Sequence, residues 1–198
     1  HLAAESHVDK SINGPKVFLE SNIIGTFNLL ESIRDHLERL DNERKNFFRF
    51  LHISTDEVYG SLDSSGYFSE DSPYSPRSPY SATKASSDHL VNAWHHTYNI
   101  PSIITNCSNN YGPWQFPEKL IPLAIYNALG SKKIPMYGDG SNVREWLYVD
   151  DHVNALIAVA NRGNLGRKYC IGSSEEHSNL DVLTLICEYL DGCQLTNL

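Results

Sequence analysis

Hydrophobic and polar positions along the chain follow two alternating patterns. Apolar residues recur at helical spacing from Pro15 to about Leu40, and a second long helical pattern runs from Tyr80 to about Asn99. Between and after them, the segments Phe47–Ser54 and Ile100–Asn106 are short, nearly continuous apolar runs, as expected for strands buried in a parallel sheet. This alternation predicts an α/β fold with a doubly wound parallel sheet.

The pattern becomes less regular in the last third of the chain. A helix from Phe116 to about Leu129 is followed by shorter predicted elements: strands over 134–140, 144–149 and 168–171, and helices over 150–161 and 180–190, the last with Asn179 as its N-cap. We therefore predict a regular α/β domain over residues 1–130 and a smaller second lobe of mixed short elements over residues 131–198 that covers a cleft.

Three segments are predicted as non-helical connections. The chain opens with His1–Ala4, which we interpret as the end of a buried strand that runs into a loop over 5–9. Its small residues permit either the close approach of a flat ligand or only a tightly packed turn. Residues 41–46 form a polar loop, and the Ser/Pro/Gly-rich loop from Tyr59 to Ser78 is long enough to be functional.

Composition narrows the function classes. The 198 residues carry a net charge of −8, which argues against a general nucleic-acid surface. No apolar run approaches the ~18 residues that a membrane span needs. The four cysteines lack metal-like spacing, so we expect reduced thiols in a cytoplasmic protein and no metal. Because the chain starts on His1 without Met and ends just after a helical pattern, we interpret it as an internal fragment.

Tyr80 and Lys84 form the first candidate for chemistry. Pro79 disfavours helix just before it, so the pair lies one turn apart on one face of the helix that follows. A free tyrosine titrates near pH ~10, and a nearby lysine cation lowers that pKa by stabilising the phenolate. Such a pair could take a proton from a sugar or alcohol hydroxyl. The spacing is also common on ordinary amphipathic helices, so the context must decide.

Thr55, Asp56 and Glu57 form the second candidate, directly after a predicted buried strand. Ligands of open α/β sheets bind outside the carboxyl ends of strands, which makes these polar residues candidates for catalysis. A solvated turn or a helix cap would explain an isolated Asp-Glu pair equally well.

Seven segments in order resemble one family. They are HLAAESHVD, ISTDEVYG, SPYSATKASSDHLV, TNCSNNYGP, FPEKLIPL, IPMYGDG and REWLYVDDH. The chain resembles the dTDP-glucose 4,6-dehydratase family of the extended short-chain dehydrogenase/reductase superfamily over essentially its whole length. Other members of the superfamily share the Tyr-x-x-x-Lys pattern, but Asp56-Glu57 after Thr55 is typical of the dehydratases.

The resemblance implies a hydro-lyase that uses NAD to convert dTDP-glucose to dTDP-4-keto-6-deoxy-glucose, a precursor of deoxysugars such as rhamnose and of cell-surface polysaccharides. Bound NAD would remove the C4 hydride while Tyr80, assisted by Lys84, takes the hydroxyl proton. Glu57 would remove the C5 proton, Asp56 would protonate the departing C6 hydroxyl, and the hydride would return to C6. Thr55 would hydrogen-bond the sugar near C4. Relatives also suggest a cytoplasmic homodimer that pairs the helices over 17–40 and 80–98.

The same resemblance implies an NAD(P)-binding, Rossmann-like sheet: residues 1–130 would be the C-terminal part of the dinucleotide-binding domain, and residues 131–198 part of a smaller, partly missing, mixed α/β nucleotide-sugar-binding lobe that also contributes to the sheet. It also assigns binding residues. The cofactor would contact Leu2, Ala3, Ala4, Glu5, Ser6, Ser21, Tyr80, Lys84 and Asn110. The substrate would contact Ser6, Thr55, Asn109, Lys119, Leu120, Pro135, Tyr137, Arg144 and Asn179. In this assignment Arg144 and Lys119 hold the diphosphate and Pro135 and Tyr137 flank the base; plain surface charge is the other interpretation of the two cations.

Three features depart from the family pattern or leave its choices open. The glycine-rich dinucleotide fingerprint and the acidic ribose-binding residue are missing, so NAD rather than NADP follows from the family alone, and the isolated chain is expected to carry no bound dinucleotide. The segment 171–177 is less glycine-rich than in the family, which bears on Asn179. An epimerase, a decarboxylase or a UDP-sugar dehydratase of the same superfamily is the alternative function, and a catalytically silent binding module is the alternative class.

Overall fold

The computed structural model describes residues 1–62, 66–136 and 138–195, with side chains as far as Gly192. The chain forms two compact units that interleave along the sequence. The first contains His1–Cys107 and Asn154–Ile171, and the second contains the remaining described residues. This division concerns compactness, so the assignment of a cofactor-binding part and a sugar-binding part on either side of residue 130 stays a prediction.

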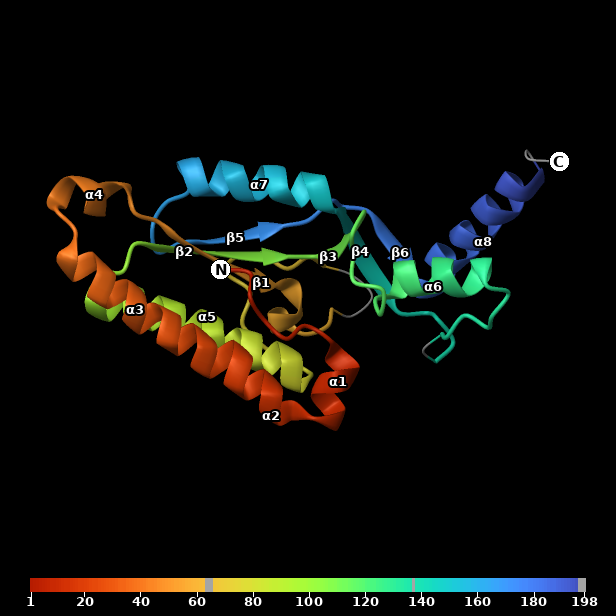
Figure 1. Ribbon diagram of the computed structural model, residues 1–198, viewed down its shortest axis with the longest axis horizontal. Helices are drawn as coiled ribbons and strands as arrows, with labels where there is room; N and C mark the ends of the chain where they lie inside the picture. Colours follow the sequence, from red (N-terminus) through yellow and green to blue (C-terminus); the bar gives the residue numbers. More distant parts are fainter. Residues whose placement is uncertain (63–65, 137, 196–198) are drawn as a thin grey trace. The chain divides into compact units, whose positions relative to one another are not determined.

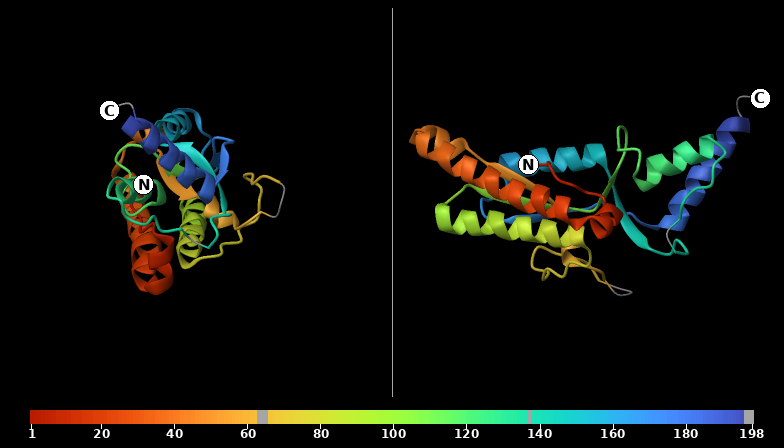
Figure 2. Two further views of the ribbon diagram at one scale, coloured as in Figure 1. Left: turned by 90° about the vertical axis from the view of Figure 1, so that its right-hand side faces the viewer. Right: turned by 60° about the horizontal axis from the view of Figure 1, so that its bottom comes forward.

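A three-stranded parallel sheet is the centre of the first unit. Its strands lie in the order β1 (Phe50–Thr55), β2 (Ser102–Cys107) and β5 (Lys168–Ile171). Helices α3 (Gly25–Arg39) and α5 (Pro79–Tyr98) lie side by side along one face, and α7 (Val149–Arg162) lies along the other (Figures 1 and 2). A parallel sheet with helices on both faces confirms the predicted α/β class.

The core of this unit lies between the sheet and the helix pair. Its buried members come from α3, β1, α5, β2 and the connection before β2: Leu30, Ile33, Phe50, Val91, Ile100 and Ile104. On α3 the buried positions follow helical spacing, and in β2 every side chain is buried. As predicted, the second strand is continuously apolar because it is buried on both faces of the sheet.

The first long helical pattern is confirmed, but it is not one regular helix. The segment begins as α2 (Pro15–Phe18), widens into the π-helix η1 (Leu19–Ile24) and continues as α3. Pro15 occupies the first helical turn, where its missing N–H costs nothing. Single-turn π segments are rare and are frequent at functional sites.

Two predicted loops contain helices. The short helices α1 (Val8–Asn13) and α4 (Asn42–Phe47) lie where connections were expected. The Asp41 side chain accepts a hydrogen bond from the Arg44 backbone N–H at 2.8 Å and so caps α4. Because α4 extends to Phe47, β1 starts at Phe50, three residues later than predicted.

The opening segment differs from the predicted buried strand. Only His1 pairs with β1: its amino group donates to the Leu51 carbonyl at 2.8 Å, and the Ile53 N–H donates to the His1 carbonyl at 3.1 Å. Leu2 is 71% exposed. The segment therefore leaves the sheet immediately and runs as an irregular stretch to His7.

The second unit contains a small mixed sheet. Strand β4 (Val143–Tyr148) pairs in parallel with β3 (Asn109–Tyr111) and antiparallel with β6 (Glu176–Ser178). Helices α6 (Leu120–Leu129) and α8 (Asn179–Leu195) complete it. Strands β3 and β6 were not predicted, because three residues are too few to show a period. The strand predicted over 134–140 is absent from the described residues of that segment.

The cap of α8 is Ser178 rather than the predicted Asn179. The Ser178 hydroxyl accepts from the Asp181 N–H at 3.0 Å, and the Asp181 carboxylate accepts from the Ser178 N–H at 3.0 Å. Asn179 is the first helical residue instead. Among the described residues, no helix is long and apolar enough to cross a membrane.

Candidate active site

Three predicted catalytic residues lie at the carboxyl end of β1. Thr55 is the last residue of the strand, and the 3-10 helix η2 (Asp56–Tyr59) follows at once. The Thr55 hydroxyl accepts from the Glu57 N–H at 3.3 Å and donates to the Asp56 carboxylate at 3.1 Å. Thr55 is therefore the residue that caps the short helix, whereas a cap was one explanation considered for Asp56 and Glu57. These two carboxylate residues are partly buried at the edge of the sheet.

Gly60 allows the chain to leave this turn. Its φ is +96°, a conformation that residues with a Cβ rarely adopt. A Cβ at this position would lie 2.5 Å from the Ser75 carbonyl oxygen, and the Ser75 N–H donates to the Val58 carbonyl at 2.9 Å. The end of the long loop therefore packs directly against the turn that carries Asp56 and Glu57.

The N-terminus of α5 places Tyr80. Ser78 caps the helix, and the hydroxyls and N–H groups of Ser78 and Ser81 satisfy each other in a capping box. The Tyr80 N–H donates to the Ser11 hydroxyl at 3.1 Å. Tyr80 is only 9% exposed. Its backbone is therefore fixed by the cap and by α1 before any ligand binds.

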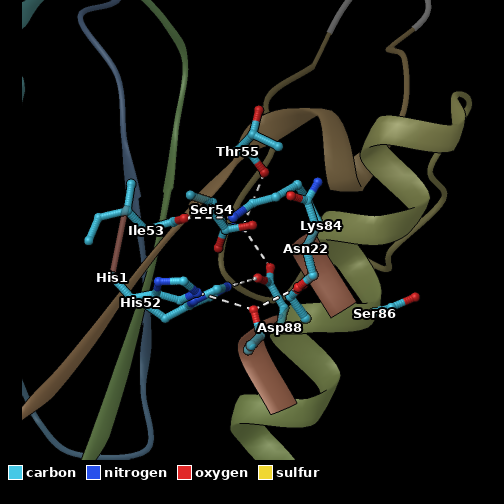
Figure 3. Close-up of polar contacts among 12 residues, drawn as sticks. His1, Asn22, His52, Ile53, Ser54, Thr55, Lys84, Ser86 and Asp88 are labelled. Atoms are coloured by element: carbon cyan, nitrogen blue, oxygen red, sulfur yellow. Dashed lines mark hydrogen bonds and ion pairs between the residues drawn. The ribbon is translucent and has the colours of Figure 1, made fainter. Parts of the chain in front are cut away.

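The electrostatics of Tyr80 differ from the expectation that Lys84 lowers its pKa. Burial first, and then the charge of Glu57, raise the pKa of Tyr80, while a hydrogen bond with Thr55 lowers it. The Lys84 ammonium donates instead to the Ile53 carbonyl at 2.8 Å (Figure 3). Burial also lowers the pKa of Lys84. The expected lowering of the Tyr80 pKa is therefore not found, because desolvation and the adjacent carboxylates dominate.

The segment predicted to line the cofactor is joined to α5 by a residue that was not predicted. Asn22, in η1, accepts from the Glu5 N–H at 2.8 Å and donates to the Glu5 carbonyl at 3.0 Å. It also donates to the Thr83 hydroxyl at 2.9 Å, and its own carbonyl accepts from Ser87. Asn22 is 1% exposed. The sequence did contain a signal for this role: Asn22 lies four residues from both Phe18 and Thr26, at a position of the helix that faces the core.

The other predicted cofactor contacts of this unit differ in exposure. Leu2, Ala3, Glu5 and Ser6 are exposed, whereas Ala4 and Ser21 are partly buried. Ser21 directly precedes Asn22 within η1. The structure therefore brings the Leu2–Ser6 segment to the helix that carries Tyr80 and Lys84 through Asn22.

A buried ionisable pair lies behind Lys84 and was also missed. The His52 Nε2 lies 3.2 Å from an Asp88 carboxylate oxygen, and both side chains are 1% exposed (Figure 3). Burial lowers the pKa of His52, against the opposing hydrogen bond with Asp88. His52 was not predicted as a polar site because the rest of its strand is apolar. Asp88 was not predicted because one aspartate among many polar residues of a helix forms no recognisable motif.

The predicted nucleotide-sugar contacts lie in the second unit. Asn109 and Asn110 are on β3, where the Asn110 side chain donates to the Ser108 carbonyl at 3.0 Å. Arg144 is exposed on β4, in register with His177 of β6. Asn179 follows β6, and its N–H donates to the Asn142 carbonyl at 3.0 Å. One small sheet therefore gathers the asparagines and Arg144.

Four further predicted contacts belong to α6 and a loop. Lys119 precedes α6 and Leu120 is its first residue. Pro135 is exposed in the loop before β4. Tyr137 lies outside the described residues.

Known proteins resemble nearly the whole chain. The family model for GDP-mannose 4,6 dehydratase matches residues 1–195. The dTDP-glucose 4,6-dehydratase 1 of Escherichia coli K12 is 56% identical over 96% of this chain and 55% of its own length. The dTDP-glucose 4,6-dehydratase of Xanthomonas campestris is 54% identical over 96% and 54%. The chain thus spans about half the length of these relatives.

Solved structures agree. The dTDP-glucose 4,6-dehydratase DesIV of Streptomyces venezuelae, solved with NAD bound, superposes with a TM-score of 0.90 at 46% identity over 96% of this chain and 56% of its own. A UDP-glucuronic acid 4-epimerase of Bacillus cereus, solved with UDP-glucuronic acid and NAD, superposes with a TM-score of 0.85. It is 32% identical over 97% of this chain and 58% of its own. These matches confirm the predicted resemblance. The chain belongs to the GDP-mannose 4,6 dehydratase family.

Proposed function

We propose that the complete protein is an NAD-dependent hydro-lyase that converts dTDP-glucose to dTDP-4-keto-6-deoxy-glucose. The observation that carries the proposal is the end of β1, where Thr55, Asp56 and Glu57 adjoin Tyr80. The relatives named dTDP-glucose 4,6-dehydratase are 54–56% identical to this chain over 96% of its length. An acid, a base and a hydroxyl-directed tyrosine are the groups that this dehydration needs.

The residues present fit the nicotinamide end of a dinucleotide. The Leu2–Ser6 segment is largely exposed and carries small side chains at Ala3 and Ala4, so a flat ring can approach its backbone. The hydroxyl of Tyr80 and the ammonium of Lys84 lie on one face of α5 as donors for a ribose. Bound NAD would supply reversible hydride acceptance; Ser21 and Asn110 are further proposed contacts.

In this proposal the chain moves three protons. Tyr80, with the Lys84 cation one turn away, takes the C4 hydroxyl proton while Thr55 holds the sugar. Oxidation at C4 acidifies the neighbouring C–H bond, and Glu57 removes the C5 proton. Asp56 then protonates the C6 hydroxyl, which leaves as water. The 6-deoxy product forms when the hydride taken from C4 is returned to C6 and a proton is added at C5. Two neighbouring carboxyl groups that do opposite work need separated pKa values, and a shared site pushes one of the two pKa values upward.

The second unit is proposed to hold the nucleotide. Arg144 can make two parallel hydrogen bonds to a phosphate, and Lys119 can act as a point charge. Asn109 and Asn179 would contact the diphosphate sugar, with Ser6 and Leu120 as further contacts. Pro135 and Tyr137 would flank the base.

The same proposal includes an oligomeric state, a cellular location and a pathway for the complete protein. We propose a cytoplasmic homodimer in which α3 and α5 pair with their copies. Its product would feed the synthesis of rhamnose and other deoxysugars for cell-surface polysaccharides.

A second candidate is an epimerase of nucleotide sugars. It is favoured by the likeness to the UDP-glucuronic acid 4-epimerase, which extends over 97% of the chain. An epimerase needs no acid–base pair for C5 and C6, so the presence of both Asp56 and Glu57 favours the dehydratase.

The test uses the complete protein with dTDP-glucose and UDP-glucose in parallel. The alkali-induced absorbance of a 4-keto-6-deoxy sugar reports the product, and Glu57→Gln is the matched variant. Product from dTDP-glucose that disappears in Glu57→Gln supports the dehydratase. Product from UDP-glucose alone changes the substrate, and an epimerised sugar without keto product establishes the second candidate.

A further inference from the structure

Asp88 lies on the same face of α5 as the predicted catalytic pair. It follows Lys84 by four residues and Tyr80 by eight, a spacing that stacks side chains along one side of a helix. Figure 3 shows Asp88 and Lys84 both directed from α5 toward β1. The Asp88 side chain is 1% exposed, so its carboxylate is removed from water.

Two donors and a histidine surround this carboxylate. The Tyr74 hydroxyl donates to Asp88 Oδ2 at 2.9 Å, and the Asn106 amide donates to the same oxygen at 3.2 Å. His52 Nε2 lies 3.2 Å from Oδ1. The carboxylate is therefore held in place from β1, from β2 and from the loop that carries Tyr74.

Lys84 is the cation one turn before Asp88 on the same face of α5, and its ammonium itself donates to the Ile53 carbonyl. Burial lowers the pKa of His52, and burial together with Lys84 lowers the pKa of the amino group of His1. Both groups therefore tend toward neutrality, and Tyr74 is a neutral donor. Lys84 is the remaining cation described at this face, and Asp88 is the first charge that opposes the cost of burying it.

The same carboxylate reaches the catalytic end of β1. The Asn106 amide that donates to Asp88 also donates to the Thr55 carbonyl at 3.2 Å. The Asn106 oxygen in turn accepts from the Tyr59 hydroxyl at 3.3 Å, at the end of η2. Asn106 thus links Asp88 to both ends of the turn that presents Asp56 and Glu57.

We propose that Asp88 is a positioning residue: it is the buried counter-charge of the Lys84 ammonium and, through Asn106, fixes the Thr55 end of β1. The catalytic part of this inference rests on the proposed function. The charge pairing does not, because it concerns only the chain's own groups.

The test titrates the Lys84 amine in the complete protein without substrate. Trace acetylation with isotopically labelled acetic anhydride, followed by mass spectrometry of the Lys84 peptide, gives its reactivity against pH. Asp88→Asn and Asp88→Ser remove the charge, and Asp88→Glu keeps it. Asp35→Asn, at an exposed position of α3, is the matched control, and thermal melting establishes which variants fold.

We expect either neutral variant to lower the Lys84 midpoint by roughly one pH unit or more, because the ammonium loses its stabilising charge. Asp88→Glu and Asp35→Asn should keep the midpoint. With dTDP-glucose, kcat of the neutral variants should fall ~10-fold and its alkaline limb should move to lower pH, with KM little changed.

A folded neutral variant with an unchanged Lys84 midpoint would overturn the inference, whichever of the two variants it is. Wild-type protein that turns over no dTDP-glucose would instead contradict the proposed function, while the amine titration would still decide the role of Asp88.

Discussion

The Asn22 amide donates to the Thr83 hydroxyl at 2.9 Å and thereby joins the π-helix η1 to the helix that carries Tyr80. The same amide makes two hydrogen bonds to the backbone of Glu5. A single buried side chain therefore ties an irregular segment, a distorted helix turn and α5 together. The π-helical widening at Leu19–Ile24 coincides with this junction, as is frequent for such segments at functional sites.

Asn22→Ala should lower the free energy of unfolding by about 2–4 kcal/mol, because the partly buried N–H and carbonyl of Glu5 lose their partner and the buried Thr83 hydroxyl loses one of its two hydrogen bonds. Urea unfolding measures this change. If the proposed function holds, KM for NAD should rise, since the Leu2–Ser6 segment loses its anchor. Asn28→Ala, at an exposed position of α3, should stay within about 0.5 kcal/mol of wild type. Equal stability of the two variants would contradict the proposed stabilising role of the Asn22 hydrogen bonds.

Gly60→Ala should be destabilising by about 2 kcal/mol or more. The substitution places a Cβ in a conformation with φ of +96° and 2.5 Å from the Ser75 carbonyl. Gly192→Ala offers the opposite case, since a Cβ there meets nothing within 4 Å and the residue is helical. That change should stabilise by up to about 1 kcal/mol. Thermal melting compares the stabilities of the two variants with that of wild type. A Gly60→Ala variant as stable as wild type would show that the loop around Ser75 shifts to accommodate the added Cβ.

Tyr80→Phe should reduce kcat by ~10²–10⁴-fold, the usual effect of losing a positioned acid–base group. Stability should change little, because the backbone contacts of Tyr80 with Ser11 and the helix cap remain. Tyr189→Phe, on an exposed residue of α8, is the control. Turnover of Tyr80→Phe within threefold of wild type would exclude Tyr80 as the base.

The sequence predicted the elements whose patterns are long. The helical stripe over 15–40 and the apolar strands were found because burial repeats along them, and the seven motifs led to the correct family. Three-residue strands carry no period, so β3 and β6 were missed. The short helix α4 was missed because its residues are polar and its cap at Asp41 resembles a loop.

The site was predictable in its identities and less so in its electrostatics. Spacing placed Tyr80 and Lys84 on one face, but it could not show that Tyr80 would be buried beside two carboxylates. Desolvation depends on what three-dimensional packing removes from water, and for Tyr80 it reverses the expected direction of the pKa change. The partners Asn22 and Asp88 were missed for the same reason, because their importance comes from burial.

The buried His52 predicts a pH dependence of stability. Its pKa is lowered in the folded chain, whereas an unfolded histidine titrates near ~6.5. As the pH falls below ~6.5, the unfolded chain takes up a proton that the folded chain refuses, so the free energy of unfolding should fall until the folded pKa is reached. Urea unfolding at about pH 7.5 and 5.5 measures this loss, which can reach about 1.4 kcal/mol for one histidine because only one pH unit of this range lies below ~6.5.

His52→Gln should reduce the slope of stability against pH, even if it lowers stability at every pH by leaving Asp88 without one partner. Burial also lowers the pKa of His152, so a weaker slope of the same sign should persist and should flatten further in the double variant with His152→Gln. His96→Gln, at an exposed position of α5, should leave the slope unchanged. A slope that His52→Gln does not alter would mean that His52 takes up its proton in the folded chain, and Asp88 would then hold a charged histidine as well as the Lys84 ammonium.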